Sequence, residues 1–209
     1  MERREFLRKG LALGAAGLLP GVGLTANDCL SLVSGIPSEP IWDAAVNGRW
    51  DVVKQWLRHD PALIATTGNV VFGINCNYEK STLLHVAVGL KSDVSVLKYL
   101  VFRDIDVNAK DSLGYTPLHH AAEFSSNVDV LEYLVSQGSA VNVKCNNGCT
   151  PLHTAVWGNP NMAVLEWLVL KGADVNEKNN SLGFTPLNVA SLSGNIAKVE
   201  YLKSVGALD

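Results

Sequence analysis

Three histidines recur along the chain at a constant spacing, and histidine is a common metal ligand. His85, His119 and His153 are separated by steps of 34 residues. Two imidazoles that share a zinc ion must each bring a nitrogen within about 2.0–2.1 Å of it. Equivalent residues on neighbouring packed helices instead lie roughly 8–10 Å apart. A metal ion shared between these histidines is therefore excluded, and we predict no metal site and no cofactor.

Two of the four cysteines lie close together in the sequence. Cys145 and Cys149 bracket the turn-forming residues Asn-Asn-Gly. Such a turn can bring two α-carbons within the roughly 4.4–6.8 Å that a disulfide requires. The gap of three residues differs from the two-residue gap of thiol redox and zinc motifs. A local disulfide and two free thiols both stay open, and we favour the free thiols.

The sequence carries no motif for catalysis or for nucleic-acid binding. It lacks a nucleophile elbow, a phosphate-binding glycine loop, a zincin helix and a paired-carboxylate arrangement. The net charge is −3, and removing the four basic and two acidic residues of positions 1–26 leaves 13 Lys and Arg against 18 Asp and Glu. Binding to phosphates needs a basic surface. We therefore expect neither an enzyme nor a nucleic-acid partner.

The repeated histidines belong to a longer internal repeat. The string Thr-Pro-Leu-His or a close variant occurs at 82–85, 116–119, 150–153 and 185–188, in steps of 34, 34 and 35 residues. The pair Val-Asn recurs at 107–108, 141–142 and 175–176, again 34 residues apart. Two independent markers with one period indicate a repeat architecture.

The residues of one unit predict a short first helix. Thr116 is typical of an N-cap, and Pro117 is typical of the first helical position, where its missing N–H costs nothing. Leu118, Ala121 and Ala122 then share one face of the helix. The helix is therefore expected to begin at Pro117 and to pack closely through small residues.

A second helix follows within the same unit. Val130, Leu131, Leu134 and Val135 lie at helical spacing, and Gly138 provides a C-terminal stop. Two short helices bury little surface alone, so several pairs must stack to form a continuous core.

These residues resemble the ankyrin repeat, whose signature is Thr-Pro-Leu-His-x-Ala with a period near 33 residues. The resemblance implies an all-α solenoid of stacked helix-turn-helix units with β-hairpin fingers. It also implies that the repeated histidine is a structural hydrogen-bonding residue, which joins the start of its helix to finger backbone. The ankyrin repeat domain is expected at 41–209, with a cap repeat at 41–64, an inserted finger loop at 65–80, and repeats at 81–110, 111–144, 145–178 and 179–209.

The terminal repeats depart from the signature, as capping repeats do. Ile41–Gly48 aligns with Leu118–Ser125 but lacks the Thr-Pro start and the histidine. The last repeat has Asn188 in place of histidine and carries Lys198 on its final helix. We interpret this final helix as a solvated cap.

The inserted loop at 65–80 lengthens the first step by about nine residues. Its apolar residues Val70, Val71 and Phe72 leave two interpretations open: a functional binding loop and an extra β-hairpin packed over the first repeat. A small periplasmic enzyme built around this insertion and Cys76 is an alternative from a different functional class.

The resemblance further implies that partners contact the finger tips and the exposed edge of the first helices, which form a concave face. The finger residues at these positions are Ser112, Leu113, Tyr115, Asn146, Asn147, Ser181, Leu182 and Phe184. The helix-edge residues are His120, Glu123, Phe124 and Trp157. Aromatic residues gathered on one face can anchor a protein contact. Packing of Phe124 or Trp157 between repeats is the alternative.

The N-terminus resembles a bacterial twin-arginine export signal. Arg3 and Arg4 are followed by Phe6 and Leu7 at the expected distance, and then by a Gly/Ala/Leu-rich run. That run is too short to span about 30 Å of hydrocarbon, so no stable membrane insertion is expected. We assign residues 1–26 to the signal and 27–40 to a linker, and the cleavage position stays open.

Taken together, these features predict an exported, periplasmic and monomeric ankyrin-repeat protein. Its expected role is a non-enzymatic protein–protein interaction module, and the sequence does not specify the partner. The main alternative is a cytoplasmic or host-directed ankyrin adaptor whose basic tail is not a signal.

Overall fold

The computed structural model describes residues 39–72, 76–180 and 182–208. The chain divides into two compact units, residues 1–63 and 64–209. The proposed signal residues Arg3, Arg4, Phe6 and Leu7 lie outside the described residues.

In the first unit, α3 (Ile41–Val46) and α4 (Trp50–His59) form a helix pair, and the 3-10 helix η1 (Pro61–Ala65) follows. In the second unit, β1 (Gly68–Phe72) and β2 (Cys76–Ser81) precede the remaining helices. These helices are α5 (Leu83–Gly89), α6 (Val94–Phe102), α7 (Pro117–Phe124), α8 (Val128–Ser136), α9 (Pro151–Gly158), α10 (Met162–Leu170), α11 (Pro186–Leu192) and α12 (Ile196–Ser204).

The first unit has the helix pair that was expected at its position. Ala44 and Ala45 of α3 are buried, as are Val53, Trp56 and Leu57 of α4, and the two helices pack against each other. The segment 41–64, where a cap repeat was expected, therefore contains a helix pair with an apolar interface between its two helices.

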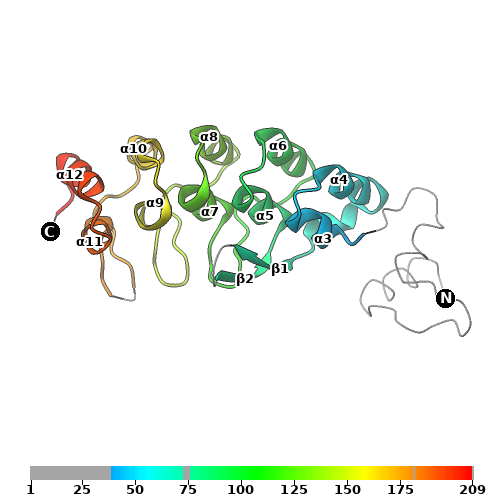
Figure 1. Cartoon of the computed structure of the whole chain (residues 1–209), viewed down its shortest axis with the longest axis horizontal. Coiled ribbons are helices and arrows are strands. Elements are labelled where there is room, and N and C mark those ends of the chain that lie inside the picture. The colour runs from blue at the N-terminus through cyan, green and yellow to red at the C-terminus, as the bar shows by residue number, and fades with distance from the viewer. Residues whose placement is uncertain (1–38, 73–75, 181, 209) are drawn as a thin grey trace, which may run out of the picture. The chain divides into compact units, whose positions relative to one another are not determined.

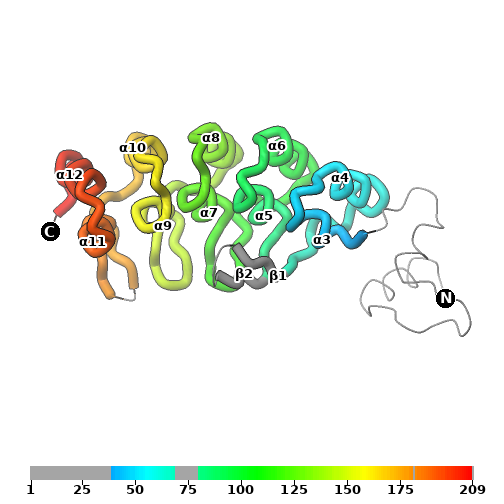
Figure 2. Tube along the Cα trace, in the orientation of Figure 1, coloured from blue at the N-terminus to red at the C-terminus, as the bar shows by residue number. Residues whose placement is uncertain are grey.

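The second unit is a stack of helix pairs. The first helices α5, α7, α9 and α11 pack in succession, and α6, α8 and α10 pack in a second row (Figure 1). The tube trace shows the two rows with the connecting fingers extending from the first-helix side (Figure 2). One leucine of each first helix is fully or almost fully buried: Leu84, Leu118, Leu152 and Leu187. The prediction of an all-α solenoid is confirmed.

The first helices begin at the predicted residues. Thr116, Thr150 and Thr185 are the N-caps of α7, α9 and α11, and each is followed by proline. Each threonine forms a capping box with the residue three positions later, which is histidine or, in the last repeat, Asn188. The capping box satisfies backbone N–H groups that have no partner inside the helix.

The fingers between repeats are tight turns. In one of them the Asp111 N–H donates to the Tyr115 carbonyl at 3.0 Å, and Gly114 has a φ of +78°. A Cβ at Gly114 would approach the Asn146 side chain within 2.4 Å. Glycine is required here because the backbone is left-handed and the next finger is in close contact.

The segment at 65–80 contains an antiparallel β-hairpin. Val70 pairs with Tyr78 and Phe72 with Cys76, and the register shifts between Gly68 and Val70. β2 also contacts α5. The hairpin of the second interpretation is therefore present and contacts α5, and whether the segment also binds a partner stays a prediction.

The expectation that the last helix is a fully solvated cap is wrong at Lys198. This side chain is only 3% exposed, and its Nζ donates to the carbonyls of Ala155 at 3.1 Å and Val156 at 2.6 Å. Those carbonyls lie in the last turn of α9, where a helix dipole favours a cation. Burial lowers the pKa of Lys198, and its hydrogen bonds satisfy the buried ammonium group.

Candidate functional site

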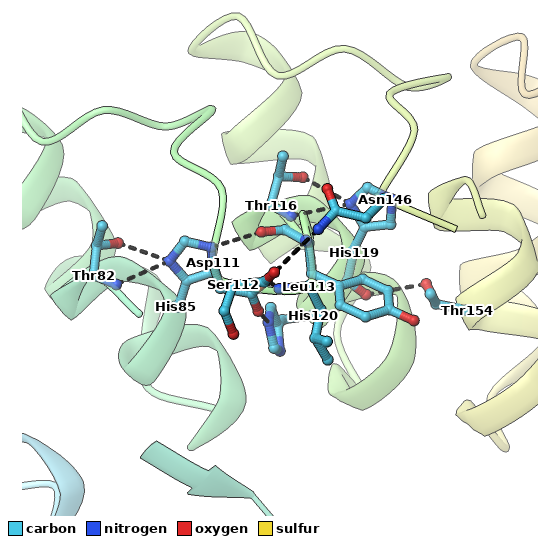
Figure 3. A network of polar contacts seen from close by, with 11 residues as sticks. Thr82, His85, Asp111, Ser112, Leu113, Thr116, His119, His120, Asn146 and Thr154 are labelled. Atoms are coloured by element: carbon cyan, nitrogen blue, oxygen red, sulfur yellow. Dashed lines mark hydrogen bonds and ion pairs between the residues drawn. The ribbon is translucent and has the colours of Figure 1, made fainter. Parts of the chain in front are cut away.

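The repeated histidines connect successive repeats. The His119 Nδ1 faces the Thr116 backbone N–H at 3.1 Å (Figure 3). Its Nε2 faces the Cys149 carbonyl at 3.0 Å. A backbone N–H can only donate and a carbonyl can only accept, so Nδ1 is the acceptor and Nε2 carries the proton. His119 is therefore a neutral link between the start of α7 and the next finger.

The same contacts occur in the neighbouring repeats. The Nε2 of His85 donates to the Tyr115 carbonyl at 3.1 Å, and that of His153 donates to the Phe184 carbonyl at 3.1 Å. Each ring nitrogen is thus engaged by protein, and no group of three His, Cys, Asp or Glu side chains suited to a metal ion occurs in the part of the chain that the structure describes.

Burial keeps these histidines neutral. Desolvation lowers the pKa of His85 and of His119 to about 4 and also lowers the pKa of His153. The geometry has the same effect, because a proton on Nδ1 would face a backbone N–H. The histidines consequently act as hydrogen-bond donors over the neutral pH range.

A buried pair that the sequence did not indicate lies beside this link. The His120 Nε2 is 3.1 Å from Asp111 Oδ2, and both side chains are buried (Figure 3). Asp111 Oδ1 also accepts hydrogen bonds from the N–H groups of Leu113 and Tyr115, each at 2.9 Å. The pair therefore ties the finger turn to α7.

This burial corrects the assignment of His120 to the partner-contacting edge. At 1% exposure its ring cannot form part of a surface. It packs edge-on against His85, with ring centroids 5.3 Å apart, and against Tyr115 at 5.9 Å. His120 supports the finger from inside the repeat.

The finger tips carry exposed side chains and are hydrogen-bonded to one another. Leu113 and Leu182 are exposed, as are Asn146 and Asn147. The Asn146 N–H donates to the Leu113 carbonyl at 3.1 Å, and the Asn180 N–H donates to the Asn147 carbonyl at 2.8 Å.

The other predicted finger residues are less exposed, or they lie outside the residues that the structure describes. Ser112, Tyr115 and Phe184 are partly buried. The Ser112 carbonyl accepts from Asn146 Nδ2 at 3.0 Å, so the Asn146 side chain also joins two fingers. Ser181 lies outside the described residues.

The helix edge contains one strongly exposed aromatic residue. Trp157 of α9 is 68% exposed, whereas Glu123 and Phe124 of α7 are partly buried. Phe124 contacts the His120 ring, with centroids 6.0 Å apart. Packing between repeats is thus excluded for Trp157, and Phe124 is in part a packing residue.

Leu192 is an exposed edge residue that the sequence analysis did not select. It takes the position of Trp157 in the next repeat and is 68% exposed. α9 and α11 pack side by side, so these two apolar side chains lie on the same face of the stack. The position could have been found by extending the repeat alignment into the final repeat.

Glu123 occupies the same position in the preceding repeat. A Cβ at Gly158 would come within 2.6 Å of the Glu123 Cγ, which shows how closely the glutamate stem lies against the end of α9. Burial raises the pKa of the Glu123 carboxyl to about 7.

The two cysteines of the central finger are free thiols. The disulfide between Cys145 and Cys149 is therefore absent from the structure, and the favoured alternative of free thiols describes it.

We define the finger–edge face by the exposed residues Leu113, Asn146, Asn147, Trp157, Leu182 and Leu192. It belongs entirely to the second unit. Among the described helices, none is both long and apolar enough to cross a bilayer.

Comparison with protein families gives two matches. The model described as ankyrin repeats (3 copies) matches residues 41–144 and 84–179, and the model described as ankyrin repeats (many copies) matches residues 159–202. A search of curated proteins gave no match. The family matches run through most of the chain and agree with the stacked helix pairs, the capped helix starts and the histidine links, so this protein belongs to the ankyrin repeat family.

Proposed function

We propose that this protein binds a partner protein through the finger–edge face. Ankyrin repeats indicate a protein–protein interaction module. We choose this face because four large apolar side chains are exposed on it, to between 45% and 69%. They are Leu113, Trp157, Leu182 and Leu192.

The face has the chemistry of a contact surface. Covering these apolar side chains favours binding by roughly 25 cal/mol for each Å² of apolar surface that is removed from water. Trp157 is large and has an indole N–H, and such residues often provide much of the binding energy of an interface. The neighbouring Asn146 and Asn147 add polar groups, so the partner is expected to present an apolar segment flanked by hydrogen-bonding groups.

The face is also held in one shape before binding. Its fingers are joined to each other by backbone hydrogen bonds of 2.8–3.1 Å and to the helices by the histidine links. A surface that is already ordered loses less conformational entropy on binding. This favours recognition of a folded or extended protein segment without rearrangement of the repeats.

Site-specific photocrosslinking in cells tests the face. A photoreactive amino acid replaces Trp157 or Leu182 in two face variants. Matched controls replace Phe102 or Leu170, which are 84% and 80% exposed but lie at the ends of the second helices α6 and α10. The proposal expects the same protein adduct from both face positions and none from the controls. Adducts only from the control positions would reject this face.

We infer further that residues 1–26 direct export to the periplasm by the twin-arginine route. The support is the Arg-Arg-x-Phe-Leu sequence at residues 3–7. A stack in which each repeat contacts only its neighbours has mostly local contacts and is expected to fold rapidly, as a route for folded cargo requires. The exported protein is proposed to act as a monomer and without catalysis.

Cell fractionation tests the export proposal. Replacing Arg3 and Arg4 with lysine should keep the protein in the cytoplasm, whereas Arg8→Lys should leave export intact. The wild type should appear in the periplasm with a shortened N-terminus. Recovery of the wild type in the cytoplasm with its full tail would instead support a cytoplasmic adaptor.

A further inference from the structure

The central finger has a cysteine where the fingers on either side have an oxygen-bearing side chain. Asp111, Cys145 and Asn179 are the equivalent first residues of three successive fingers. Asp111 Oδ1 accepts hydrogen bonds from the N–H groups of Leu113 and Tyr115 at 2.9 Å. The start of each finger is therefore arranged to bind an acceptor side chain.

The third finger repeats this arrangement with an amide. Asn179 Oδ1 accepts from the N–H groups of Leu182 and Phe184, both at 3.1 Å. The donors lie at corresponding points of the two fingers, although the third finger is one residue longer.

Cys145 stands at the start of the same kind of turn, because its N–H donates to the Cys149 carbonyl as that of Asp111 does to the Tyr115 carbonyl. Interaction with the Cys149 side chain, and then with the backbone N–H groups of Asn147 and Cys149, lowers the pKa of Cys145. A neutral thiol is a weak acceptor, whereas a thiolate makes strong charge-assisted hydrogen bonds with two donors. The turn at Cys145 thus resembles the turns in which Asp111 and Asn179 accept hydrogen bonds from finger N–H groups.

Cys149 lies directly beside this sulfur. Its thiol is hydrogen-bonded to Cys145, which lowers the pKa of Cys145 to about 6 and raises the pKa of Cys149. The Cys145 N–H donates to the Cys149 carbonyl at 2.9 Å. A turn closed in this way can bring the two α-carbons within the roughly 4.4–6.8 Å range of disulfides.

The two sulfurs differ in access. Cys145 is buried and Cys149 is partly exposed. An external reagent therefore reaches Cys149, while Cys145 is placed to react with whatever forms on Cys149. A reactive cysteine with a resolving cysteine beside it is the arrangement on which thiol–disulfide exchange depends.

We propose that Cys145 and Cys149 form a reversible redox pair, which small-molecule disulfides convert into an intrachain disulfide across the central finger. In the starting pair Cys145 carries the negative charge and Cys149 carries the proton. Cys149 passes this proton to the Cys145 thiolate as its own sulfur attacks one sulfur of the reagent RSSR, which forms a mixed disulfide and releases RS⁻.

The second step closes the finger. Cys145 gives its proton to RS⁻, and its thiolate attacks the Cys149 sulfur of the mixed disulfide. The bond between Cys149 and the reagent breaks, and a second RS⁻ leaves and takes a proton from solvent. The two protein sulfurs lose two electrons, and the reagent is reduced to two thiols.

The disulfide would restrain the central finger, which is hydrogen-bonded to the finger before it and to the finger after it. Asn146 donates to the Leu113 carbonyl of the preceding finger, and the Asn147 carbonyl accepts from Asn180 of the following one. A disulfide across residues 145 and 149 therefore restrains a segment that is bonded on both sides. The redox chemistry does not depend on the identity of a partner and can be tested without one.

The test uses the full chain with Cys29→Ser and Cys76→Ser, so that only the proposed pair can react. Reduced protein is treated with glutathione disulfide at neutral pH and followed by intact mass and peptide mapping. The expected product is lighter by two hydrogens and has residues 145 and 149 linked. A dithiol should return it to the starting mass, and its helical circular dichroism should be unchanged throughout.

Cys145→Asp is the matched control, because it copies the finger that begins at Asp111. It should keep the fold, which its urea midpoint checks, and react with glutathione disulfide at least tenfold more slowly, stopping at an adduct on Cys149. A Cys145→Ser variant gives the same comparison if the aspartate variant fails to fold. Stable glutathione adducts without the linked product, or equal rates for wild type and control, would overturn the proposal.

Discussion

The histidine of each repeat makes one hydrogen bond back to its own helix start and one forward to the next finger. His119 accepts from the Thr116 N–H and donates to the Cys149 carbonyl. Both of these groups would lose their partner inside the protein if the ring were removed. At the residue scale, this predicts that the ring contributes substantially to stability.

Replacing His119 with alanine should cost about 2–4 kcal/mol of unfolding free energy, because it leaves two polar groups unsatisfied and opens a cavity. His119→Asn is the informative comparison. In the last repeat Asn188 Oδ1 accepts from the Thr185 N–H at 3.0 Å, so asparagine should keep the cap and lose only the finger bond. Urea unfolding should order the stabilities as wild type, asparagine, alanine. An alanine variant as stable as wild type would contradict the histidine link.

Stability should fall as the pH is lowered from about 6.5 to about 4. In this interval His85 and His119 bind a proton when unfolded but not when folded, because burial lowers their pKa from 6.5 to about 4. Glu123 acts in the opposite direction, since its pKa is raised from 4.5 to about 7 in the folded protein. Each net proton changes stability by about 1.4 kcal/mol per pH unit.

Protonation of the histidines and of Glu123 changes the free energy of unfolding in opposite directions. Urea unfolding at several pH values therefore distinguishes the two contributions. Glu123→Gln should make the loss of stability toward acid steeper, because it removes the only one of these three groups that binds its proton more tightly when folded. His119→Asn should make the loss shallower. Identical pH profiles for the two variants would show that these groups do not control the acid response.

The residue scale also shows what the sequence could and could not predict. The role of the repeated histidine was implied by the resemblance to the ankyrin repeat, which the motif at fixed spacing carries. The Asp111–His120 pair did not, because it depends on how the finger folds back onto α7, and a separation of nine residues carries no periodic signal. The prediction for Lys198 was wrong because a charged side chain normally lies in solvent. Here two backbone carbonyls at the end of α9 accept hydrogen bonds from its ammonium group.

At the scale of elements, the fingers depend on glycine for two separable reasons. Gly114 has a φ of +78° and contacts Asn146, whereas Gly183 has a φ of +67° and nothing within 4 Å of an added Cβ. Gly183→Ala should cost about 1 kcal/mol from backbone strain alone. Gly114→Ala should cost clearly more, because the neighbouring finger must also move. Equal losses in thermal or urea unfolding would show that the contact between fingers is loose.

Lys198 provides the second test at this scale. It occupies the place of Val130 and Val164 in the preceding repeats, but its ammonium group reaches the end of α9. Lys198→Met keeps the apolar stem and should cost about 1–2 kcal/mol, because charge-assisted hydrogen bonds to two carbonyls are lost. Hydrogen exchange should increase at the end of α9. An unchanged exchange rate there would contradict the capping role.

At the scale of the molecule, the proposed binding face depends on which positions of the repeat remain uncovered. The period predicted the helix pairs and the finger tips, because both are fixed by local sequence. Exposure of the edge residues was harder to predict, since it depends on what the next repeat covers. Glu123 is partly buried, whereas Trp157 at the equivalent position of the next repeat is exposed. Leu192 completes the face in the last repeat.

The most direct test of the proposed binding face uses the partner that photocrosslinking identifies. Its affinity for this protein is measured by calorimetry with both proteins purified and not crosslinked. Trp157→Ala should weaken binding at least tenfold, which corresponds to about 1.4 kcal/mol, without a change in the urea midpoint. Phe102→Ala removes an aromatic residue of a second helix that is even more exposed than Trp157, and it should leave the affinity unchanged. Equal affinities for wild type and Trp157→Ala, or a loss confined to Phe102→Ala, would contradict the account.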